Sequence, residues 1–373
     1  MKIALVHDQL CEFGGSERVL VALKKIFPQA DVFTLAYDQK SLGTHQEEFK
    51  RWNIKTSWFG KIPIIKHYYS PFRFLTPLIW ESFDFSKYDL VISSSGSWMS
   101  KGIKTKKPTV HISYIHHPPR YLYGYETAIE WQKYFLVRLY AHIINHFLRV
   151  WDYESSQRPD FIIANSQETR SRIKKFYRRD STVIYPPVDI PTKIKNLKFE
   201  IKNYYLTVSR LARAKHVDVV IKAANKLKFN LKVVGSGRDE ERLKQIAGPT
   251  VKILNKTDDK SLQELYKNAK AFLFAARDDE FGIAPIEAMS YELPVIAYNS
   301  GGLKETVIDG QNGFLFNDLN EDSLIEKIKL LEKMPEKDLI TMKNNARLSS
   351  KKYSFPNFKK QILEFIKKHA RTT

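Results

Sequence analysis

The chain has 373 residues, of which 43% are hydrophobic and 13% aromatic, and its formal net charge is +20. This length gives a prior of two or three domains, and the apolar content is enough for real cores, so a disordered chain is excluded. A charge of this size indicates an anionic partner, which can be nucleic acid, a membrane surface or a phosphorylated small molecule. The single cysteine, Cys11, excludes an intramolecular disulfide and a cysteine metal cluster, and it suits a reducing cytoplasm.

The N-terminus does not predict a secretory signal peptide, because His7 and Asp8 directly follow the short apolar run Ile3–Val6. No uncharged apolar stretch reaches the length that is needed to span a membrane. The longest candidate, Tyr134–Trp151, is interrupted by arginine and histidine side chains and is predicted to be an amphipathic helix.

The first half of the chain predicts the opening of a doubly wound α/β unit. Short apolar runs predict strands at Lys2–Val6, Asp31–Leu35, Asp89–Gly96, Thr109–Ile115 and Asp160–Ala164. Gly14 and Gly15 follow the first strand, and Ser16 is expected to cap the next helix. Adjacent glycines let a backbone approach a ligand closely, although a purely structural turn explains them equally well.

The segment Trp58–Tyr88 mixes isoleucine and aromatic side chains with lysine, arginine and histidine. Such a mixture suits a membrane interface, where aromatic rings and cations meet lipid headgroups. The alternative is an ordinary domain surface with a few aromatic side chains that face the core. Our hypothesis is that this face contacts an anionic membrane.

The strand Thr109–Ile115 is followed at once by the run His116-His117-Pro118-Pro119-Arg120-Tyr121. Open α/β sheets bind their ligands at the carboxyl ends of the strands, so this run is a candidate ligand loop. Two histidines beside prolines are otherwise ordinary loop residues.

The second half of the chain repeats the strand–helix alternation. Strands are predicted at Tyr204–Val208, Leu231–Val234, Val251–Leu254, Ala271–Phe274 and Leu293–Ala297. Two α/β domains with parallel sheets therefore follow, with the lysine-rich stretch that ends at Lys202 as their linker.

Arg210 and Lys215 lie at a predicted strand-to-helix junction, where they can converge on one anion, or else form a solvated surface. Gly235 begins a short glycine loop after the next strand. That loop falls short of a dinucleotide-binding fingerprint, because no acidic ribose partner follows at the expected distance.

The run Ala275–Met289 is the main candidate ligand-binding segment of the second half of the chain. Acidic residues that include Asp279 crowd a turn, Gly282 follows, and Pro285 fits the first turn of a helix. Glu287 is expected in that first turn. The helix-start amides favour a bound anion, while an acidic surface loop that caps the helix is the alternative.

Taken together, these segments resemble the retaining glycosyltransferases of family 4, which have the GT-B fold. The run that ends at Glu287 is similar to the family's E-x7-E motif, but Asp279 stands at the first acidic position, with Glu280 beside it. The family's Arg-x4-Lys pair falls on Arg210 and Lys215, and its active-site histidine falls on His116 rather than His117.

The resemblance implies a set of site residues. Catalytic roles fall on His116 and Asp279, and acceptor-side roles on Gly14, Arg120 and Tyr121. Donor-binding roles fall on Gly15, Arg210, Lys215, Gly235, Glu280, Phe281, Gly282, Ile283 and Glu287. Within this set, Glu287 is implied to hold the ribose of a nucleotide-sugar, and the first acid lies beside the transferred sugar.

The implied architecture is two Rossmann-like domains with a cleft between them. Residues 1–192 form the acceptor-side domain, residues 193–352 bind the nucleotide-sugar, and the helix in residues 353–373 crosses back to the first domain.

Within the family, the chain looks most like bacterial mannosyltransferases of surface-polysaccharide assembly. The expected donor is GDP-mannose, with UDP-sugars next, and the expected acceptor is a glycan or a lipid-linked sugar. No Asp-x-Asp motif occurs, so neither a metal nor any other cofactor is expected. The expected location is cytoplasmic and peripheral, on the inner face of the membrane.

Three alternatives remain open from the sequence. The chain could be another GT-B enzyme such as a sugar-nucleotide epimerase, or a nucleotide-sugar-binding protein without catalysis. A basic nucleic-acid-binding protein is supported by net charge alone, and no nucleic-acid reading motif accompanies that charge.

Overall fold

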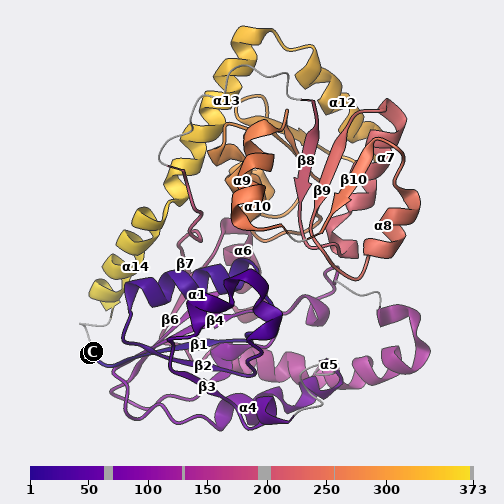
Figure 1. The fold of residues 1–373 in the computed structure, drawn as a ribbon. Helices are drawn as coiled ribbons and strands as arrows, with labels where there is room; N and C mark the ends of the chain where they lie inside the picture. Colours follow the sequence, from indigo (N-terminus) through magenta and orange to yellow (C-terminus); the bar gives the residue numbers. More distant parts are fainter. Residues whose placement is uncertain (63–69, 128–130, 192–202, 256, 370–373) are drawn as a thin grey trace. The chain divides into compact units, whose positions relative to one another are not determined.

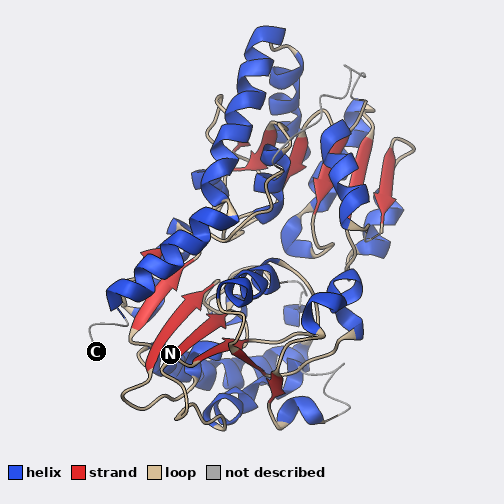
Figure 2. Ribbon diagram, turned by 60° about the vertical axis from the view of Figure 1, so that its left-hand side comes forward, coloured by secondary structure: helices blue, strands red, loops and turns tan. Residues whose placement is uncertain are grey.

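The computed structural model describes residues 1–62, 70–127, 131–191, 203–255 and 257–369 (Figure 1). The chain divides into two compact units. Unit 1 comprises Met1–Tyr125, Trp131–Pro187 and Phe355–Thr373, and unit 2 comprises Glu126–Glu130 and Val188–Ser354. Each unit contains one parallel sheet with flanking helices, which confirms the predicted α/β class (Figure 2). The predicted linker before Lys202 lies outside the described residues.

The sheet of unit 1 is parallel throughout and has the order β3-β2-β1-β4-β5-β6-β7. Its strands are β1 (Ile3–His7), β2 (Asp31–Thr34), β3 (Ile54–Thr56), β4 (Leu90–Ser95), β5 (Val110–Ile115), β6 (Phe161–Ala164) and β7 (Thr182–Val183). From β1 the chain builds the sheet toward β3, and it then returns to add β4 on the other side. The gap between the ends of β1 and β4 is therefore a topological switch point.

The α-helices of unit 1 are α1 (Gly15–Ile26), α2 (Gln46–Phe49), α4 (Thr76–Glu81), α5 (Phe135–Ser156), α6 (Gln167–Tyr177) and α14 (Phe355–His369). The predicted cap of α1 is wrong: the N-cap is Gly14 rather than Ser16, and the Gly14 amide donates to Glu17 Oε2 at 2.8 Å. A carboxylate three residues into the helix satisfies that amide instead of a serine hydroxyl.

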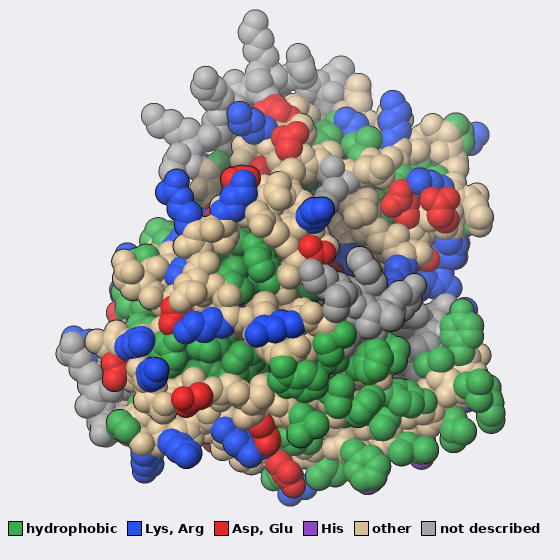
Figure 3. All heavy atoms as spheres, turned by 60° about the horizontal axis from the view of Figure 1, so that its bottom comes forward, with side chains coloured by type: hydrophobic (Ala, Val, Ile, Leu, Met, Phe, Trp, Pro, Cys, Tyr) green, Lys and Arg blue, Asp and Glu red, His purple; other side chains and the backbone are tan. Residues whose placement is uncertain are grey.

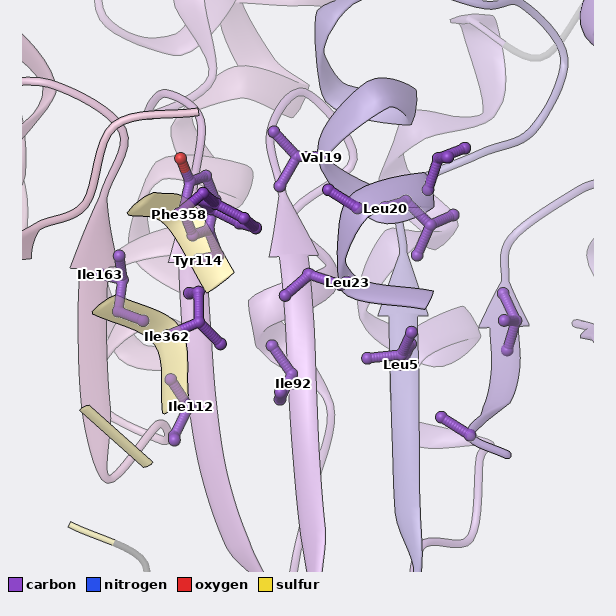
Figure 4. Packing of buried hydrophobic residues seen from close by; sticks show 14 of the residues in the cluster. Leu5, Val19, Leu20, Leu23, Ile92, Ile112, Tyr114, Ile163, Phe358 and Ile362 are labelled. Carbon is purple, nitrogen blue, oxygen red and sulfur yellow. The ribbon is translucent and has the colours of Figure 1, made fainter. Parts of the chain in front are cut away.

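Both faces of the unit 1 sheet are buried, as expected for parallel strands. Along β1, Leu5 packs into one cluster with α1 and α14, while Ala4 and Val6 pack into a second cluster that contains Trp80 and Trp98. In Figure 4, Phe358 and Ile362 of α14 lie over the strand residues of the first cluster, next to the side chains of α1. The last helix is thus part of the core of unit 1.

The imidazole of His111, on β5, is fully buried, with Nε2 2.9 Å from Ser93 Oγ. Burial lowers its pKa to about 3. The unfolded chain binds the proton near pH 6.5, so this histidine costs stability as the pH falls below that value. The linkage amounts to about 2 kcal/mol between pH 7 and pH 5.

We therefore expect His111→Gln, which keeps a partner for Ser93, to remove about 2 kcal/mol of the loss in unfolding free energy between pH 7 and pH 5. Denaturant unfolding at both pH values measures this difference. His146→Gln, at an exposed position of α5, is the control and should keep the wild-type difference. Equal pH dependence in all three proteins would contradict the prediction.

The sheet of unit 2 has the order β10-β9-β8-β11-β12-β13 and is also parallel. Its strands are β8 (Tyr205–Val208), β9 (Leu231–Val234), β10 (Val251–Leu254), β11 (Phe272–Phe274), β12 (Val295–Tyr298) and β13 (Gly313–Phe316). Its α-helices are α7 (Val217–Leu227), α8 (Glu240–Ile246), α9 (Asp259–Asn268), α10 (Ile283–Ser290), α11 (Leu303–Thr306), α12 (Glu321–Glu332) and α13 (Glu336–Ser350). The switch point of this sheet lies between β8 and β11.

Within the part of the chain that the structure describes, no helix has both the length and the apolar character that crossing a bilayer requires. The predicted amphipathic helix forms as α5, which has 22 residues.

Candidate functional site

The candidate residues of unit 2 gather at the carboxyl edge of its sheet. Arg210 and Lys215 follow β8, and the acidic run follows β11, its neighbour across the switch point. Two loops that are far apart in the sequence are therefore brought together where open α/β sheets bind ligands. The backbone joins them too, because the Arg277 amide donates to the Ala214 carbonyl at 3.2 Å.

Lys215 and Asp279 form an ion pair at this edge. Lys215 Nζ lies 2.8 Å from Asp279 Oδ1, and the two side chains are 23% and 13% exposed. Both groups are partly withdrawn from water but can still be reached by a ligand. The first acidic position of the predicted motif thus contacts the lysine of the predicted Arg-x4-Lys pair.

Arg210 is exposed beside a buried, unsatisfied hydroxyl. The preceding residue, Ser209, has a buried Oγ for which no hydrogen-bond partner is found among the described residues. Gly235 approaches the same loop from β9, with a φ of 145°, and a Cβ there would lie 1.9 Å from the Ser209 carbonyl oxygen. Only glycine fits this contact. Another cation of this loop, Arg213, lies 3.8 Å from Asp239.

The loop from β11 leads through Glu280 and Phe281, both buried, to Gly282, which is the N-cap of α10 with a φ of 84°. The helix begins at Ile283, and no side chain caps it among the described residues. Its first amides are thus left for another acceptor. Phe281 packs edge-on against Tyr353 at 5.2 Å between ring centroids, which anchors the loop.

Glu287 is the fifth residue of α10, so its prediction in the first turn is wrong, and it begins the second turn. The side chain is 9% exposed, and Tyr266 Oη donates to its Oε2 at 3.0 Å. Tyr266 in turn stacks on Tyr291, with 5.5 Å between the ring centroids. The carboxylate is therefore held in one position by a hydrogen bond and a packed aromatic pair.

The turn at Gly301 and Gly302 packs against the backbone of the acidic loop. The Gly302 amide donates to the Asp279 carbonyl at 2.7 Å, and Ser300 Oγ accepts from the Asp278 amide at 3.0 Å. A Cβ on Gly301 would lie 2.2 Å from the Asp279 carbonyl oxygen. The two glycines allow this turn to press against the loop.

Replacing Gly301 by alanine should lower the free energy of unfolding by about 3 kcal/mol, because the φ of 58° is unfavourable and the methyl group meets backbone. Gly310→Ala is the matched control. Its φ is 75°, but nothing lies within 4 Å of the added Cβ, so only the backbone term of about 1 kcal/mol applies. Denaturant unfolding measures both, and equal losses would refute the role of the contact.

The candidate residues of unit 1 also lie at a carboxyl edge. Gly14 and Gly15 follow β1, and His116 follows β5, whose neighbour β4 borders the switch point. Asp8 shapes this edge: its carboxylate accepts hydrogen bonds from the amides of Gly96, Trp98 and Ser100, at 2.7–3.0 Å.

His116 ends a buried chain of four hydrogen-bonded side chains. Glu17 Oε1 lies 3.2 Å from His7 Nε2, His7 Nδ1 lies 3.0 Å from Ser94 Oγ, and Ser94 Oγ lies 2.7 Å from His116 Nε2. None of the four is more than 7% exposed. Burial alone would raise the pKa of Glu17, but the hydrogen bond and charge of His7 outweigh it and hold that pKa below its usual value.

The chain links the glycine loop to the histidine. The other carboxylate oxygen of Glu17 accepts from the Gly14 amide, so one side chain fixes both the loop and His7. Because a carboxylate only accepts, His7 must carry a proton on Nε2. Whether His7 Nδ1 carries a proton then determines whether the Ser94 hydroxyl donates to His7 or to His116.

Arg120 and Tyr121 begin the short 3-10 helix Arg120–Leu122, after His116, and both are partly buried. The Arg73 guanidinium lies over the Tyr121 ring, 4.0 Å from its centroid. His117 has a different environment from His116, since its Nδ1 lies 3.0 Å from the Pro118 carbonyl oxygen.

Sequence reasoning missed His7, Glu17, Ser94 and Tyr266 as members of the site. His7 is the last residue of β1, and Glu17 lies in the first turn of α1, the helix that follows it. That position at the carboxyl edge was the one available indication. Nothing in the sequence near Tyr266 points to Glu287.

The two parallel sheets, each with its switch point, define a protein of the two-domain GT-B type. Residues 13–191 match the family described as Glycosyltransferase Family 4, and residues 189–349 match the family described as Glycosyl transferases group 1. Together the two models span residues 13–349, so the chain belongs to this group of glycosyltransferases, which confirms the predicted family, the GT-B fold and the prediction of a glycosyltransferase.

Named relatives agree with this assignment. The chain is 26% identical to the alpha-1,3/1,6-mannosyltransferase alg2 of Schizosaccharomyces pombe over 377 residues, which cover 84% of this chain and 70% of the relative. It is 26% identical to ALG2 of Candida glabrata over 419 residues, covering 93% and 88%. Among solved structures, Anabaena Alr3699/HepE in complex with UDP-glucose has a TM-score of 0.72 at 20% identity, covering 99% and 100%, which shows the shared fold.

Proposed function

We propose that the chain is a retaining glycosyltransferase that moves mannose from GDP-mannose to a glycan or lipid-linked acceptor in surface-polysaccharide synthesis. The observation that supports this most directly is the Lys215–Asp279 pair at the switch point of unit 2, next to Arg210. The mannosyltransferase names of the relatives favour mannose as the transferred sugar.

In this reaction the bond between the anomeric carbon and the diphosphate breaks, and an acceptor oxygen bonds to that carbon. The acceptor hydroxyl proton leaves with the diphosphate or passes to solvent. The step needs stabilisation of the negative charge on the leaving diphosphate. Arg210 supplies a guanidinium that can bind it in two places, Lys215 adds a point charge, and the first amides of α10 add their dipoles.

The remaining roles follow from side-chain chemistry. Glu287, held by Tyr266, accepts hydrogen bonds from the hydroxyls of the ribose, while Gly235 lets the backbone approach the nucleotide. Asp279 positions the hexose once the diphosphate has drawn Lys215 away from it. The family resemblance gives His116 a hydrogen bond to the sugar, Gly15 a role in donor binding, and Gly14, Arg120 and Tyr121 roles on the acceptor side. No step in this scheme uses a metal ion.

A UDP-sugar is the second candidate donor, because the structural neighbour Alr3699/HepE was solved in complex with UDP-glucose. A GT-B sugar-nucleotide epimerase would use the same diphosphate site without an acceptor. Thermal unfolding with GDP-mannose, UDP-glucose and ADP-glucose separates the donors, since a ligand at a hundred times its Kd stabilises the folded chain by about 2.7 kcal/mol. We expect the largest shift with GDP-mannose.

Product analysis tests the reaction itself. With the preferred donor and a lipid-linked sugar acceptor, NMR should show the anomeric configuration of the donor kept in the product, and EDTA should leave the rate unchanged. An inverted product would overturn the retaining mechanism, and loss of activity that added metal restores would overturn metal independence. Release of an epimerised sugar nucleotide without any acceptor product would favour the epimerase.

The lipid-linked acceptor places the enzyme at the inner face of a membrane. The sequence-based hypothesis is that Trp58–Tyr88 contacts this surface. Residues 63–69 of that segment lie outside the described residues, and of the rest Trp58, Phe74 and Leu78 are exposed apolar side chains.

A further inference from the structure

The helix α5 presents an unusual number of apolar side chains to solvent. Leu136 is 76% exposed and Phe147 is 65% exposed, and it is a contiguous set of such residues, rather than any single one, that marks an interaction surface. The other exposed apolar residues of the helix are Phe135, Val137, Leu139, Tyr140, Ile143, Val150 and Tyr153. A helix with this much uncovered apolar surface needs something to cover it.

Helical spacing sorts the side chains of α5 into three faces. Ala141, Leu148 and Asp152 are buried and attach the helix to unit 1. Asp152 accepts from Tyr123 Oη at 2.6 Å and is ion-paired with Lys101, so this attachment is firm.

The second face is an apolar stripe, which we define as Leu136, Tyr140, Ile143, Phe147 and Val150. These residues follow one another at intervals of three or four, so they lie along one side of the helix.

The third face is cationic and lies between the buried face and the exposed apolar side chains. Arg138, His142 and Arg149 are exposed, and their spacing of four and seven residues again places them along one side. No aspartate or glutamate occurs between Phe135 and Trp151. From Phe135 to Trp151 the helix therefore combines uncovered apolar surface with positive charge, while the buried Asp152 and the exposed Glu154 lie near its C-terminal end.

The apolar surface continues onto neighbouring elements of unit 1. Tyr140 Oη donates to the Pro71 carbonyl oxygen, which places the 3-10 helix Ser70–Leu75 and α4 beside α5. Phe74 and Leu78 on these elements are 45% and 61% exposed. Figure 3 shows hydrophobic side chains gathered broadly on the face of the molecule where α4 and α5 lie.

We propose that the apolar stripe of α5 inserts into the headgroup region of an anionic phospholipid bilayer, with Arg138 and Arg149 bound to lipid phosphates. A helical segment such as Phe135–Trp151, which is apolar on one side, cationic on another and without acidic residues, is suited to lying in that interface. Charge complementarity favours a lipid over a second copy of the chain, because a two-fold contact would set the same cations against each other.

The biological role of this contact, which is to bring the enzyme to a lipid-linked acceptor, rests on the proposed function, but the membrane binding itself does not. It differs from the sequence-based hypothesis because the main element is α5 rather than Trp58–Tyr88. The test below measures binding and not turnover, so the two proposals can fail separately.

The test is co-sedimentation of the full chain with phosphatidylcholine vesicles that contain either no phosphatidylglycerol or about 30% of it. Each vesicle type is tested at low and at high salt. We expect binding to the anionic vesicles that weakens with salt. The double variant Ile143→Glu/Phe147→Glu should bind roughly a hundredfold more weakly, because two inserted apolar groups are lost. Arg138→Gln/Arg149→Gln should bind on the order of tenfold more weakly.

Matched controls lie elsewhere on the surface. Leu330→Glu/Leu348→Glu replaces two leucines that are 52% and 59% exposed on α12 and α13, and Lys359→Gln/Lys360→Gln removes two exposed charges from α14. Both should bind like the wild type. Equal binding by all variants would refute the role of α5. A wild-type dimer in sedimentation velocity that becomes a monomer in the α5 variants, without vesicle binding, would assign the stripe to self-association instead.

Discussion

Replacing Lys215 by alanine should lower kcat by about a hundred- to a thousandfold, which makes it one of the two most damaging single changes that we expect. The lysine has two tasks in the proposed reaction: it neutralises the departing diphosphate, and in the free enzyme it holds Asp279 at 2.8 Å. Truncation removes the charge and leaves a partly buried carboxylate without its cation. Steady-state kinetics with the preferred donor measure the loss.

The control for this experiment is Lys222→Ala. Lys222 lies on α7, 50% exposed and 4.0 Å from Asp218, so its removal changes the net charge equally without touching the site. Lys215→Arg keeps the charge and should recover part of the rate. If Lys215→Ala and Lys222→Ala have the same kcat, the diphosphate role is wrong.

A double-mutant cycle separates the two tasks of the lysine. If Lys215 acts only by holding Asp279, then Lys215→Ala should add no further loss in the Asp279→Asn background. If it also binds the diphosphate, most of its effect should persist there. The cycle is informative because residues in contact give interaction energies of about 0.5–3 kcal/mol, well above the error of the rates.

Most strands of both sheets could be predicted because buried parallel strands are short apolar runs that stand out from polar loops. The edge strand β3 was missed because its three side chains are not fully buried and form no apolar run. The ends of those runs were correct to within about two residues, as expected for pattern reasoning. The cap of α1 was missed for a physical reason: a serine beside a helix start is a good cap, but Glu17 satisfies the Gly14 amide from within the helix.

Pairings within the sites could not be predicted, because they depend on which strands become neighbours. Lys215 and Asp279 are 64 positions apart and meet only because β8 lies next to β11. His7 and Ser94, 87 positions apart, meet for the same reason at β1 and β4. Sequence order does not record strand order, so such contacts need the folded chain.

Amphipathic patterning has a related limit. The sequence predicted α5 as an amphipathic helix, but a period of 3.6 does not say which side faces the core. In the fold the buried side is narrow and includes Ala141, Leu148 and Asp152, while most of the larger apolar side chains point outward.

The second large effect is expected at His116, where glutamine should lower kcat by about a hundred- to a thousandfold. Glutamine can still hydrogen-bond Ser94, so the fold of the edge should survive while the imidazole is lost. His117→Gln is the matched control, one residue away on the same loop, and should stay within about threefold of the wild-type rate. A larger loss at His117 than at His116 would reverse the assignment between these neighbours.

Ser94→Ala tests whether the buried chain positions His116 rather than merely filling space. It leaves the imidazole in place but removes the hydroxyl that links His116 to His7 and Glu17. The hydrogen bond to Ser94 then no longer determines which ring nitrogen of His116 carries the proton. We expect a smaller fall in kcat, about tenfold, together with a displaced pH–rate profile for kcat. A purely structural role would lower stability and leave the profile in place. A displaced profile in Ser94→Ala, absent in His117→Gln, would therefore tie the glycine loop, through Glu17 and His7, to the reactivity of His116.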